Sequence, residues 1–333
     1  MSSDPTAAGL AKRAGRFDVH AHYVPDFYRR AAEAAGFGKP DGMPGIPPWS
    51  LDSALTMMDR NDIETSMLSI SAPGIFFGDA AAAVSLARDV NEFAAGIVAK
   101  HPGRFGFFAM LPLPDVEAAL AEIAYAMDVL RADGIVITSN QSGIYPGDPR
   151  YEPVFAELGR REANLFVHPT SPSCRCPGGT ELNIPRPIVE FMFETTRVVS
   201  NLILTGTTRR HPGMRLIIPH AGAALPVLTD RIAGVLGMLP STSELAPSQV
   251  YEEMSRIFYD VAGFSLPRLL PVLLQITGHD HLLYGSDWPH TPEAVVAGMI
   301  RDLETAELFD EARRKALWHG NARRIFPRLA AKR

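Results

Sequence analysis

Short apolar runs alternate with longer segments of helical periodicity along most of the chain, and this alternation restricts the possible fold more than any other feature. It is typical of repeated βα units, in which helices connect the strands of a parallel sheet. Helices are expected, for example, at residues 80–100 and 116–132. Eight strands are expected, at residues 16–22, 64–71, 104–111, 134–139, 164–169, 215–220, 256–261 and 281–287. This number predicts a TIM-type (β/α)8 barrel, and a doubly wound open sheet is the alternative.

The composition limits the class of protein. The chain has 333 residues, which one α/β barrel can occupy. Hydrophobic residues make up 46% and charged residues 21%, as in a globular enzyme with a large core. The net charge of −5 argues against a nucleic-acid partner. No apolar run approaches the roughly 20 residues that a bilayer requires, so no membrane partner is expected.

The N-terminus, the rest of the chain and the cysteines each lead to an expectation. Residues 1–15 lack the apolar segment of a signal peptide, so we expect a disordered tail on a cytoplasmic protein. One barrel domain with long βα loops should follow at residues 16–328. The two cysteines, Cys174 and Cys176, are too close together for a disulfide framework and are expected to be reduced thiols in a loop.

Two long loops rich in glycine and proline follow the first and fifth expected strands, at residues 23–49 and 170–187. In a (β/α)8 barrel the active site lies at the C-terminal ends of the strands and is built by the loops that follow them. These two loops are therefore expected to surround a pocket at that end of the barrel.

Several potential metal ligands stand at the C-terminal ends of expected strands. His20 and His22 are two residues apart on one strand, so their side chains should share a face. The others are His168 after the fifth strand, His220 after the sixth and Asp287 after the eighth. Three histidines and one aspartate form an N3O ligand set that suits a divalent ion such as zinc and leaves room for water or a chelating substrate.

Other histidines are expected at the opposite end of the barrel. His101 and His211 each begin a turn that leads into a strand, and His279 and His281 also precede one. That end of the barrel contributes to stability and seldom to catalysis. This second HxH pair is therefore expected to be structural, and His319 is expected at a helix junction.

Motifs distributed over nearly the whole chain resemble the amidohydrolase superfamily: DVHAHYVPDFY, FVHPT, IIPHAGAALP and YGSDWPH. Within it the chain is most similar to the metal-dependent decarboxylases that act on aminocarboxymuconate semialdehyde, γ-resorcylate and, closest of these, 6-methylsalicylate. The resemblance implies an amidohydrolase-like barrel with one divalent ion, zinc or alternatively manganese. The implied ligands are His20, His22, His168 and Asp287, with His220 as the catalytic imidazole.

Two departures from related enzymes narrow the expected chemistry. The fourth strand, at residues 134–140, lacks the carboxylated lysine or glutamate that bridges two ions in two-metal members of the superfamily, so one ion is expected. Ala54 and Thr56 stand where the aminocarboxymuconate enzymes carry two arginines, which argues against a dicarboxylate substrate. The expected substrate is a small aromatic acid, an ortho-hydroxybenzoate that could chelate the ion directly.

The resemblance suggests roles for further residues. Either His220 or Asp287 could donate the proton that replaces carbon dioxide. Asp287 is the preferred donor, with His220 positioning a water or relaying the proton. Asp260 and His290 are expected to orient the metal ligands from behind. Aromatic side chains on loops are expected to enclose the substrate ring, namely Tyr23, Phe76, Phe77 and Trp288.

Two other functions use the same residues. A metal-dependent hydrolase of a lactone or amide would activate a water on the ion, with His220 as the base. A barrel that keeps the metal only for stability would have no catalytic function. A homodimer is expected from the resemblance, and the helix at residues 188–205 has enough apolar surface for an interface.

Overall fold

A computed structural model describes residues 15–173, 184–239 and 245–330. Eight strands form one sheet in sequence order, and each is parallel to the next. The strands are β1 (Arg16–His22), β2 (Ile63–Ser69), β3 (Phe105–Met110), β4 (Gly134–Thr138), β5 (Asn164–His168), β6 (Arg215–Ile218), β7 (Phe258–Asp260) and β8 (Leu282–Leu283).

The sheet closes on itself through the segment that follows β8. The N–H of Val19 on β1 donates to the carbonyl of Tyr284 at 2.9 Å, and the N–H of His22 donates to the carbonyl of Trp288 at 2.8 Å. These bonds belong to parallel bridges between the first strand and the segment after the last one. The expected (β/α)8 barrel is therefore confirmed, and the open sheet is excluded.

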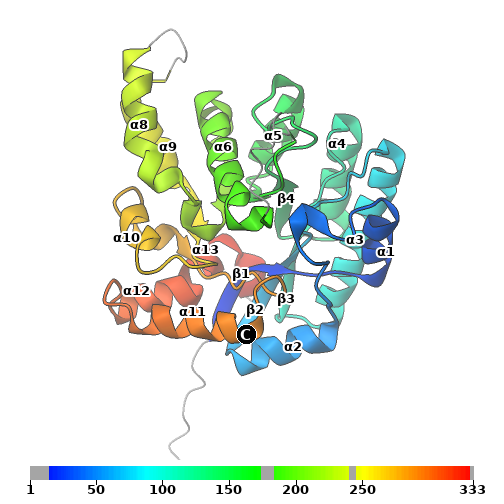
Figure 1. The fold of residues 1–333 in the computed structure, drawn as a ribbon. Helices are drawn as coiled ribbons and strands as arrows, with labels where there is room; N and C mark the ends of the chain where they lie inside the picture. Colours follow the sequence, from blue (N-terminus) through cyan, green and yellow to red (C-terminus); the bar gives the residue numbers. More distant parts are fainter. Residues whose placement is uncertain (1–14, 174–183, 240–244, 331–333) are drawn as a thin grey trace, which may run out of the picture.

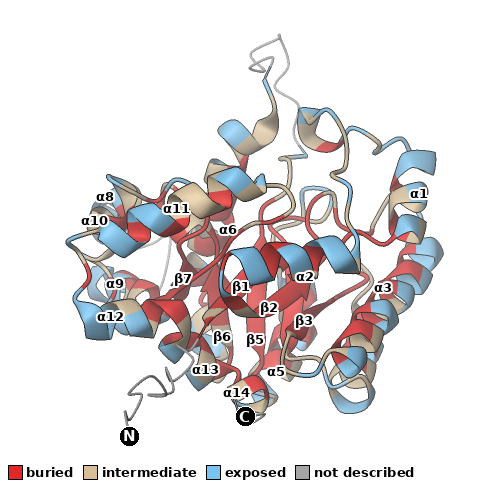
Figure 2. Cartoon of the chain, turned by 90° about the horizontal axis from the view of Figure 1, so that it is seen from below, coloured by how far each residue is buried: buried red, intermediate tan, exposed pale blue. Residues whose placement is uncertain are grey.

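Helices surround the barrel, as Figure 1 shows, and Figure 2 shows buried strands inside helices whose outer faces are exposed. Most helices connect one strand to the next in the manner of βα units. The helices are α1 (Asp26–Ala34), α2 (Leu51–Arg60), α3 (Ala80–Lys100), α4 (Val116–Ala124), α5 (Glu152–Arg160), α6 (Glu190–Leu204), α7 (Thr207–Arg210), α8 (Leu225–Met238), α9 (Pro247–Arg256), α10 (Leu269–Leu273), α11 (Glu293–Thr305), α12 (Glu311–Lys315), α13 (Asn321–Ile325) and α14 (Pro327–Ala330).

Local sequence signals explain several helix boundaries. Ser50 caps α2, because its hydroxyl accepts from the N–H of Ser53 at 3.1 Å and the Ser53 hydroxyl accepts in return from the N–H of Ser50. Asp79 caps α3 in the same way by accepting from the N–H of Ala82 at 3.0 Å. Both caps satisfy N–H groups that the first turn of a helix leaves without partners.

The expected boundaries differ from the observed ones in several places. β8 ends at Leu283, four residues earlier than expected, because the chain turns after it and Asp287 has a φ of +56°. The helix expected at 116–132 becomes α4 followed by a wider π-helical turn at Tyr125–Val129. The region expected as a loop at 23–49 contains α1.

Aromatic rings fill the barrel below the two histidines of β1. Phe166 lies between His20, at 5.0 Å between ring centroids, and Phe108, at 5.3 Å. Phe326, which follows α13, contacts Phe108 at 5.8 Å and Phe17 at 5.6 Å. The C-terminal segment therefore closes the N-terminal end of the barrel, and the opposite end is left for the functional groups.

Several expectations concern the rest of the chain. No helix in the described ranges is long and apolar enough to cross a membrane. The helix expected at 188–205 is present as α6. The tail expected at 1–15 lies outside the described residues except for Gly15, and Cys174 and Cys176 lie outside them as well.

Candidate metal centre

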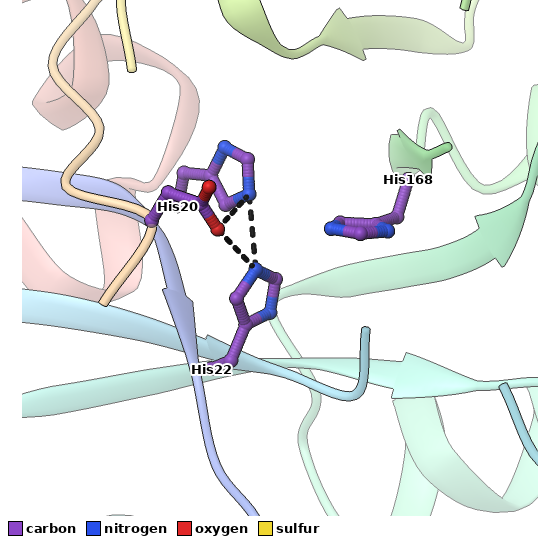
Figure 3. A group of neighbouring side chains, drawn as sticks. His20, His22 and His168 are labelled. Atoms are coloured by element: carbon purple, nitrogen blue, oxygen red, sulfur yellow. Dashed lines mark hydrogen bonds and ion pairs between the residues drawn. The ribbon is translucent and has the colours of Figure 1, made fainter. Parts of the chain in front are cut away.

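Three imidazoles and one carboxylate meet at the C-terminal end of the barrel, and Figure 3 shows the three histidines facing a common space. The candidate ligand atoms of His20, His22, His168 and Asp287 all lie within 4.8 Å of one another. His20 Nε2 is 3.0 Å from His22 Nε2. Asp287 Oδ1 is 3.1 Å from His22 Nε2 and 3.4 Å from His20 Nε2. The structure thus brings the four expected ligands together.

The positions of these four groups follow from the elements that carry them. His20 and His22 point into the barrel because they alternate on β1 with outward-facing residues. His168 is the last residue of β5. Asp287 belongs to the turn after β8, where its N–H donates to the carbonyl of His20 at 2.7 Å. This backbone bond holds the aspartate beside the first histidine.

The other ring nitrogen of each ligand histidine faces an oxygen acceptor. His20 Nδ1 is 2.9 Å from Asp260 Oδ2, and His168 Nδ1 is 2.7 Å from the carbonyl of Pro169. His22 Nδ1 is 3.0 Å from the hydroxyl of Ser69 and 3.3 Å from its carbonyl. With the hydrogen held on Nδ1, each Nε2 directs a lone pair into the common space.

This tautomer pattern is a test of whether the site fits a cation. When both Nε2 atoms are deprotonated, as metal binding requires, their lone pairs face each other at 3.0 Å and repel each other. A divalent cation held by His20, His22, His168 and Asp287 would remove that repulsion, with Asp287 supplying negative charge. The donor set therefore fits one divalent metal ion.

The electrostatics of three of the ligands agree with this fit. Burial alone would raise the pKa of Asp287, but the neighbouring His20, His22 and His220 outweigh burial and hold the pKa well below its usual range. Burial lowers the pKa of His22 to about 4 despite the Asp287 carboxylate. Burial and the adjacent imidazoles also lower the pKa of His168. These side chains are in the charge states that metal coordination requires.

His20 differs because two carboxylates face it. Burial alone would lower its pKa, but Asp260 and Asp287 outweigh burial and raise the pKa to about 9. Asp260 is held in turn by the backbone N–H groups of His220 and Ala262, at 3.1 and 3.0 Å. Asp260 thus lies where expected, behind a ligand histidine, and metal binding at neutral pH must displace a proton from His20.

His220 lies beside the cluster and not within it. Its Nε2 is 3.6 Å from Asp287 Oδ2, and its ring centroid is 5.2 Å from that of His20. Its Nδ1 is buried without a hydrogen-bond partner. His220, Ala221 and Ala223 all have positive φ angles, so this segment adopts a strained turn that brings the imidazole to Asp287.

His290 lies on the other side of the HxH pair. Its ring centroid is 5.3 Å from that of His22, and its Nε2 is 2.8 Å from the hydroxyl of Ser71. Burial lowers the pKa of His290, which favours the neutral ring. His290 therefore lies beside a ligand histidine with its Nε2 bonded to Ser71, and its expected role in orienting a ligand stays a prediction.

The structure does not bring Tyr23 to the site. Its side chain is buried, its hydroxyl donates to the carbonyl of Val90 on α3 at 2.9 Å, and its ring stacks on Phe93. It follows His22 directly, so alternation places it on the helix side of the strand. The expectation that Tyr23 contacts the substrate is therefore corrected.

The other aromatic residues expected around the substrate occupy loops after β2 and β8. Phe76 and Phe77 are partly exposed, and Phe77 contacts Phe37 at 5.1 Å between ring centroids. Trp288 is buried, with 9% of its surface exposed, next to Asp287. These three side chains remain candidates for contact with a substrate ring.

Several polar residues near the site were missed from the sequence. Asp18 lies below His20 on the same face of β1, and it accepts from the hydroxyl of Ser286 at 2.6 Å. Burial raises the pKa of Asp18 to about 7 despite this bond. Ser69, whose hydroxyl contacts His22, and Glu194 are also buried. The spacing 18, 20, 22 in an otherwise apolar strand could have indicated Asp18, whereas the others have no local signal.

The second HxH pair lies away from the metal centre. His279 Nε2 donates a hydrogen bond to the carbonyl of Leu308 at 3.2 Å. His281 stacks on Phe258 at 4.6 Å. Among the described residues no second cluster of three or more metal-binding groups is found. The structural role expected for this pair agrees with these contacts.

A closed (β/α)8 barrel with one N3O cluster at the C-terminal ends of its strands defines a class of proteins, the barrels that hold a mononuclear metal site. The family model described as amidohydrolase matches residues 17–328. This chain belongs to the amidohydrolase family.

Three similar proteins illustrate the relationship. A 6-methylsalicylic acid decarboxylase of Aspergillus aculeatus is 38% identical over 94% of this chain and 96% of its own length. A 6-methylsalicylic acid decarboxylase of Penicillium expansum is 36% identical over 94% of this chain and 97% of its own. A crystal structure described as amidohydrolase II is 34% identical, covers 94% of this chain and 99% of its own, and superposes with a TM-score of 0.89.

Proposed function

We propose that this protein is a metal-dependent carboxy-lyase that removes carbon dioxide, without oxidation, from an ortho-hydroxybenzoate such as 6-methylsalicylate. The observation that carries the proposal is the arrangement of Asp287, which directs one carboxylate oxygen at two ligand histidines and the other at His220. The two fungal relatives at 38% and 36% identity, both 6-methylsalicylic acid decarboxylases, support the substrate class.

One divalent ion held by the four ligands would act as a Lewis acid for the carboxylate and adjacent hydroxyl of such a substrate. We propose zinc, because three imidazoles and one carboxylate suit it, with manganese as the alternative. The absence of a lysine or glutamate on β4 supports a single ion. The substrate orientation then depends on the ligand geometry that Asp260, Ser69 and Pro169 maintain.

The residues of the chain supply the proton. Decarboxylation replaces a C–C bond with a C–H bond, so one proton must reach the ring carbon that loses the carboxylate. Asp287 Oδ2 donates this proton to the ring carbon. His220 Nε2, which lies 3.6 Å from Asp287 Oδ2, then returns a proton to the carboxylate. The neighbouring imidazoles outweigh burial and hold the pKa of Asp287 well below its usual range, so its protonated form gives up the proton readily.

Loop side chains would enclose the substrate ring. We propose Phe76, Phe77 and Trp288 for this role, because they lie on the loops after β2 and β8 that border the site. Enclosure by aromatic side chains excludes water and orients the ring toward Asp287.

The test is removal and return of the ion. The protein is dialysed against a chelator, and release of carbon dioxide from 6-methylsalicylate is measured before and after addition of zinc or manganese. We expect activity to disappear with the ion and to return with it. Full turnover by the metal-free protein would refute the proposal.

Product analysis separates the competing functions. A decarboxylase releases carbon dioxide and the corresponding phenol, whereas a hydrolase adds water to a lactone or amide. Mass spectrometry of the products with each substrate class distinguishes these outcomes. A loaded protein that acts on neither class would favour the barrel that keeps metal for stability.

We also propose a cytoplasmic homodimer. Ile188 and Phe193, in and beside α6, are 60% and 50% exposed, which supports an apolar contact surface at this helix. Phe193→Ser should then shift the mass measured by sedimentation from dimer to monomer. Cell fractionation tests the compartment.

A further inference from the structure

We propose that Glu194 is a positioning residue for the ligand His168 and that it acts through the Ser139 hydroxyl and one peptide group. The inference rests on the proposed metal site and deepens it. Glu194 is buried on α6, outside the ligand cluster, and does not belong to the N3O set.

The argument begins at the ligand. His168 Nδ1 donates to the carbonyl of Pro169 at 2.7 Å, and this bond directs Nε2 toward the other ligands. His20 is oriented differently, because a carboxylate, Asp260, contacts its Nδ1 directly. The orientation of His168 therefore depends on how firmly the Pro169 carbonyl is held.

That carbonyl belongs to the same planar peptide group as the N–H of Thr170. The Thr170 N–H donates to the hydroxyl oxygen of Ser139 at 3.1 Å. Because this oxygen accepts from Thr170, its own hydrogen is available for another acceptor. The Ser139 hydroxyl donates this hydrogen to Glu194 Oε2 at 3.4 Å. The hydrogen bonds thus run in one direction from His168 to the carboxylate.

The carboxylate itself is fixed from several sides. Its Oε2 accepts from Asn140 Nδ2 at 2.8 Å, and its Oε1 accepts from the hydroxyl of Tyr145 at 2.7 Å and pairs with Arg197. Asn140 also donates to the carbonyl of Ser171 at 3.1 Å. Glu194 therefore connects the loops after β4 and β5 to α6, beside the ligand histidine.

The common direction of these hydrogen bonds and the charge of Glu194 give the path from His168 an effect beyond packing. Hydrogen bonds that share one direction polarise one another, and an anion at the acceptor end strengthens each of them. The negative charge of Glu194 then favours the hydrogen on His168 Nδ1 and the lone pair on Nε2. A neutral group of the same shape at position 194 would keep the packing but weaken this preference.

A matched control exists elsewhere in the barrel. Glu122 is also buried, and it binds the side chains of Arg88 and Asn91, each at 2.8 Å. It lies on α4 and contacts none of the four ligands. Replacing Glu122 tests the general cost of neutralising a buried carboxylate in this fold.

The experiment uses Co²⁺ as the probe in the metal-free protein. Glu194→Gln should weaken Co²⁺ affinity by about 10- to 100-fold and alter the visible absorption of the bound ion, since the field of one imidazole changes. Glu122→Gln should lower the midpoint of thermal unfolding but keep the wild-type affinity and spectrum. Equal Co²⁺ affinities for the Glu194→Gln and wild-type proteins would overturn the proposal.

The route through Ser139 has its own test. Ser139→Ala removes the hydroxyl that joins Thr170 to Glu194 and leaves the carboxylate in place. It should weaken Co²⁺ binding, and the double variant with Glu194→Gln should be no weaker than the worse single variant. Fully additive losses would show that the two residues act independently and would overturn the route.

This test is separate from that of the proposed function. A wild-type protein that binds Co²⁺ but releases no carbon dioxide from hydroxybenzoates would refute the decarboxylase proposal and leave the role of Glu194 intact. Wild-type Co²⁺ affinity in both Glu194→Gln and Ser139→Ala would refute the positioning role without affecting the proposed reaction.

Discussion

At the residue scale, the three ligand histidines differ in what orients their rings. A buried carboxylate, Asp260, faces His20, the hydroxyl and carbonyl of Ser69 face His22, and a backbone carbonyl faces His168. A carboxylate partner raises the basicity of an imidazole more than a neutral acceptor does. We therefore expect the basicity of each ligand histidine to change by a different amount when the group that faces its Nδ1 is removed.

Asp287→Asn should remove both metal affinity and decarboxylation. The amide keeps the shape of the side chain but supplies no negative charge between His20 and His22, and it cannot donate an acidic proton. We expect metal affinity to fall by at least about 100-fold. Metal content after dialysis and release of carbon dioxide are the measurements.

His279→Ala is the control for that variant. Its ring bonds to the carbonyl of Leu308, away from the cluster, so metal content and activity should be unchanged. If His279→Ala lost the ion while Asp287→Asn kept it, the site would have been assigned to the wrong end of the barrel.

The raised pKa of His20 makes the stability of the metal-free protein depend on pH. The pKa is about 9 in the folded chain and 6.5 for an ordinary histidine, so the protonated ring stabilises the fold fully below pH 6.5. This contribution is lost as the pH rises to about 9, at most on the order of 3 kcal/mol. Urea unfolding of the metal-free protein at pH 6 and pH 9 measures it.

The His20→Asn variant identifies the group responsible. It lacks the ionisable ring, so its free energy of unfolding should fall less between these two pH values than that of the wild type. An equal decline in both proteins would assign the pH dependence to other groups.

At the scale of elements, the closure between β1 and the segment after β8 determines the site. Gly285 lies in this segment, and a methyl group added to it would lie 2.7 Å from His20 Cβ and 3.2 Å from Asp260 Cγ. Neither neighbour is the free end of a flexible side chain. Glycine is therefore required here for close approach of two backbones at the metal ligand.

Gly285→Ala should separate His20 from Asp260 and disturb the ligand geometry. We expect metal affinity to fall by at least about tenfold, because both a ligand and its orienting carboxylate are displaced. Isothermal titration with zinc measures the change.

Gly96→Ala is the comparison for that substitution. Gly96 is within α3, and no atom lies within 4 Å of an added methyl group. This variant should bind metal normally and gain up to about 1 kcal/mol in stability, from helix propensity. Similar losses of affinity in the two variants would contradict the steric explanation.

At the scale of the whole molecule, the two ends of the barrel have different functions. The C-terminal ends of the strands carry the polar cluster, and the other end is closed by the last segment of the chain. Phe326 is buried there against Phe17 and Phe108. Stability and chemistry are therefore separated along the barrel axis.

Phe326→Ala tests this separation. Loss of a buried aromatic ring should lower the free energy of unfolding by about 3 to 5 kcal/mol, because a cavity is left in the core. The folded variant should keep its metal affinity at low temperature, since the ring is distant from the ligands. Thermal unfolding and metal titration at 10 °C together check the prediction. A variant that folds but loses the ion would show that the two ends are coupled.

Much of the fold and the ligand set could be predicted from sequence. The eight strands could be located because apolar runs and helical periodicity are local, and His20 and His22 could be assigned to one face because alternation is local as well. The end of β8 at Leu283 could not be predicted, since the chain there follows its pairing with β1. Tyr23 was misplaced because β1 was treated as ending in a loop that faces the site.

What the sequence alone determined is the chemistry of the site: which residue types occur, and at which ends of which strands. What only the tertiary structure decided is how those groups are held. His20 and Asp260 are 240 positions apart, and the path from His168 to Glu194 passes through Ser139 and the peptide after Pro169. Hydrogen bonds between distant segments depend on the distances and angles that packing creates, and no local pattern encodes them.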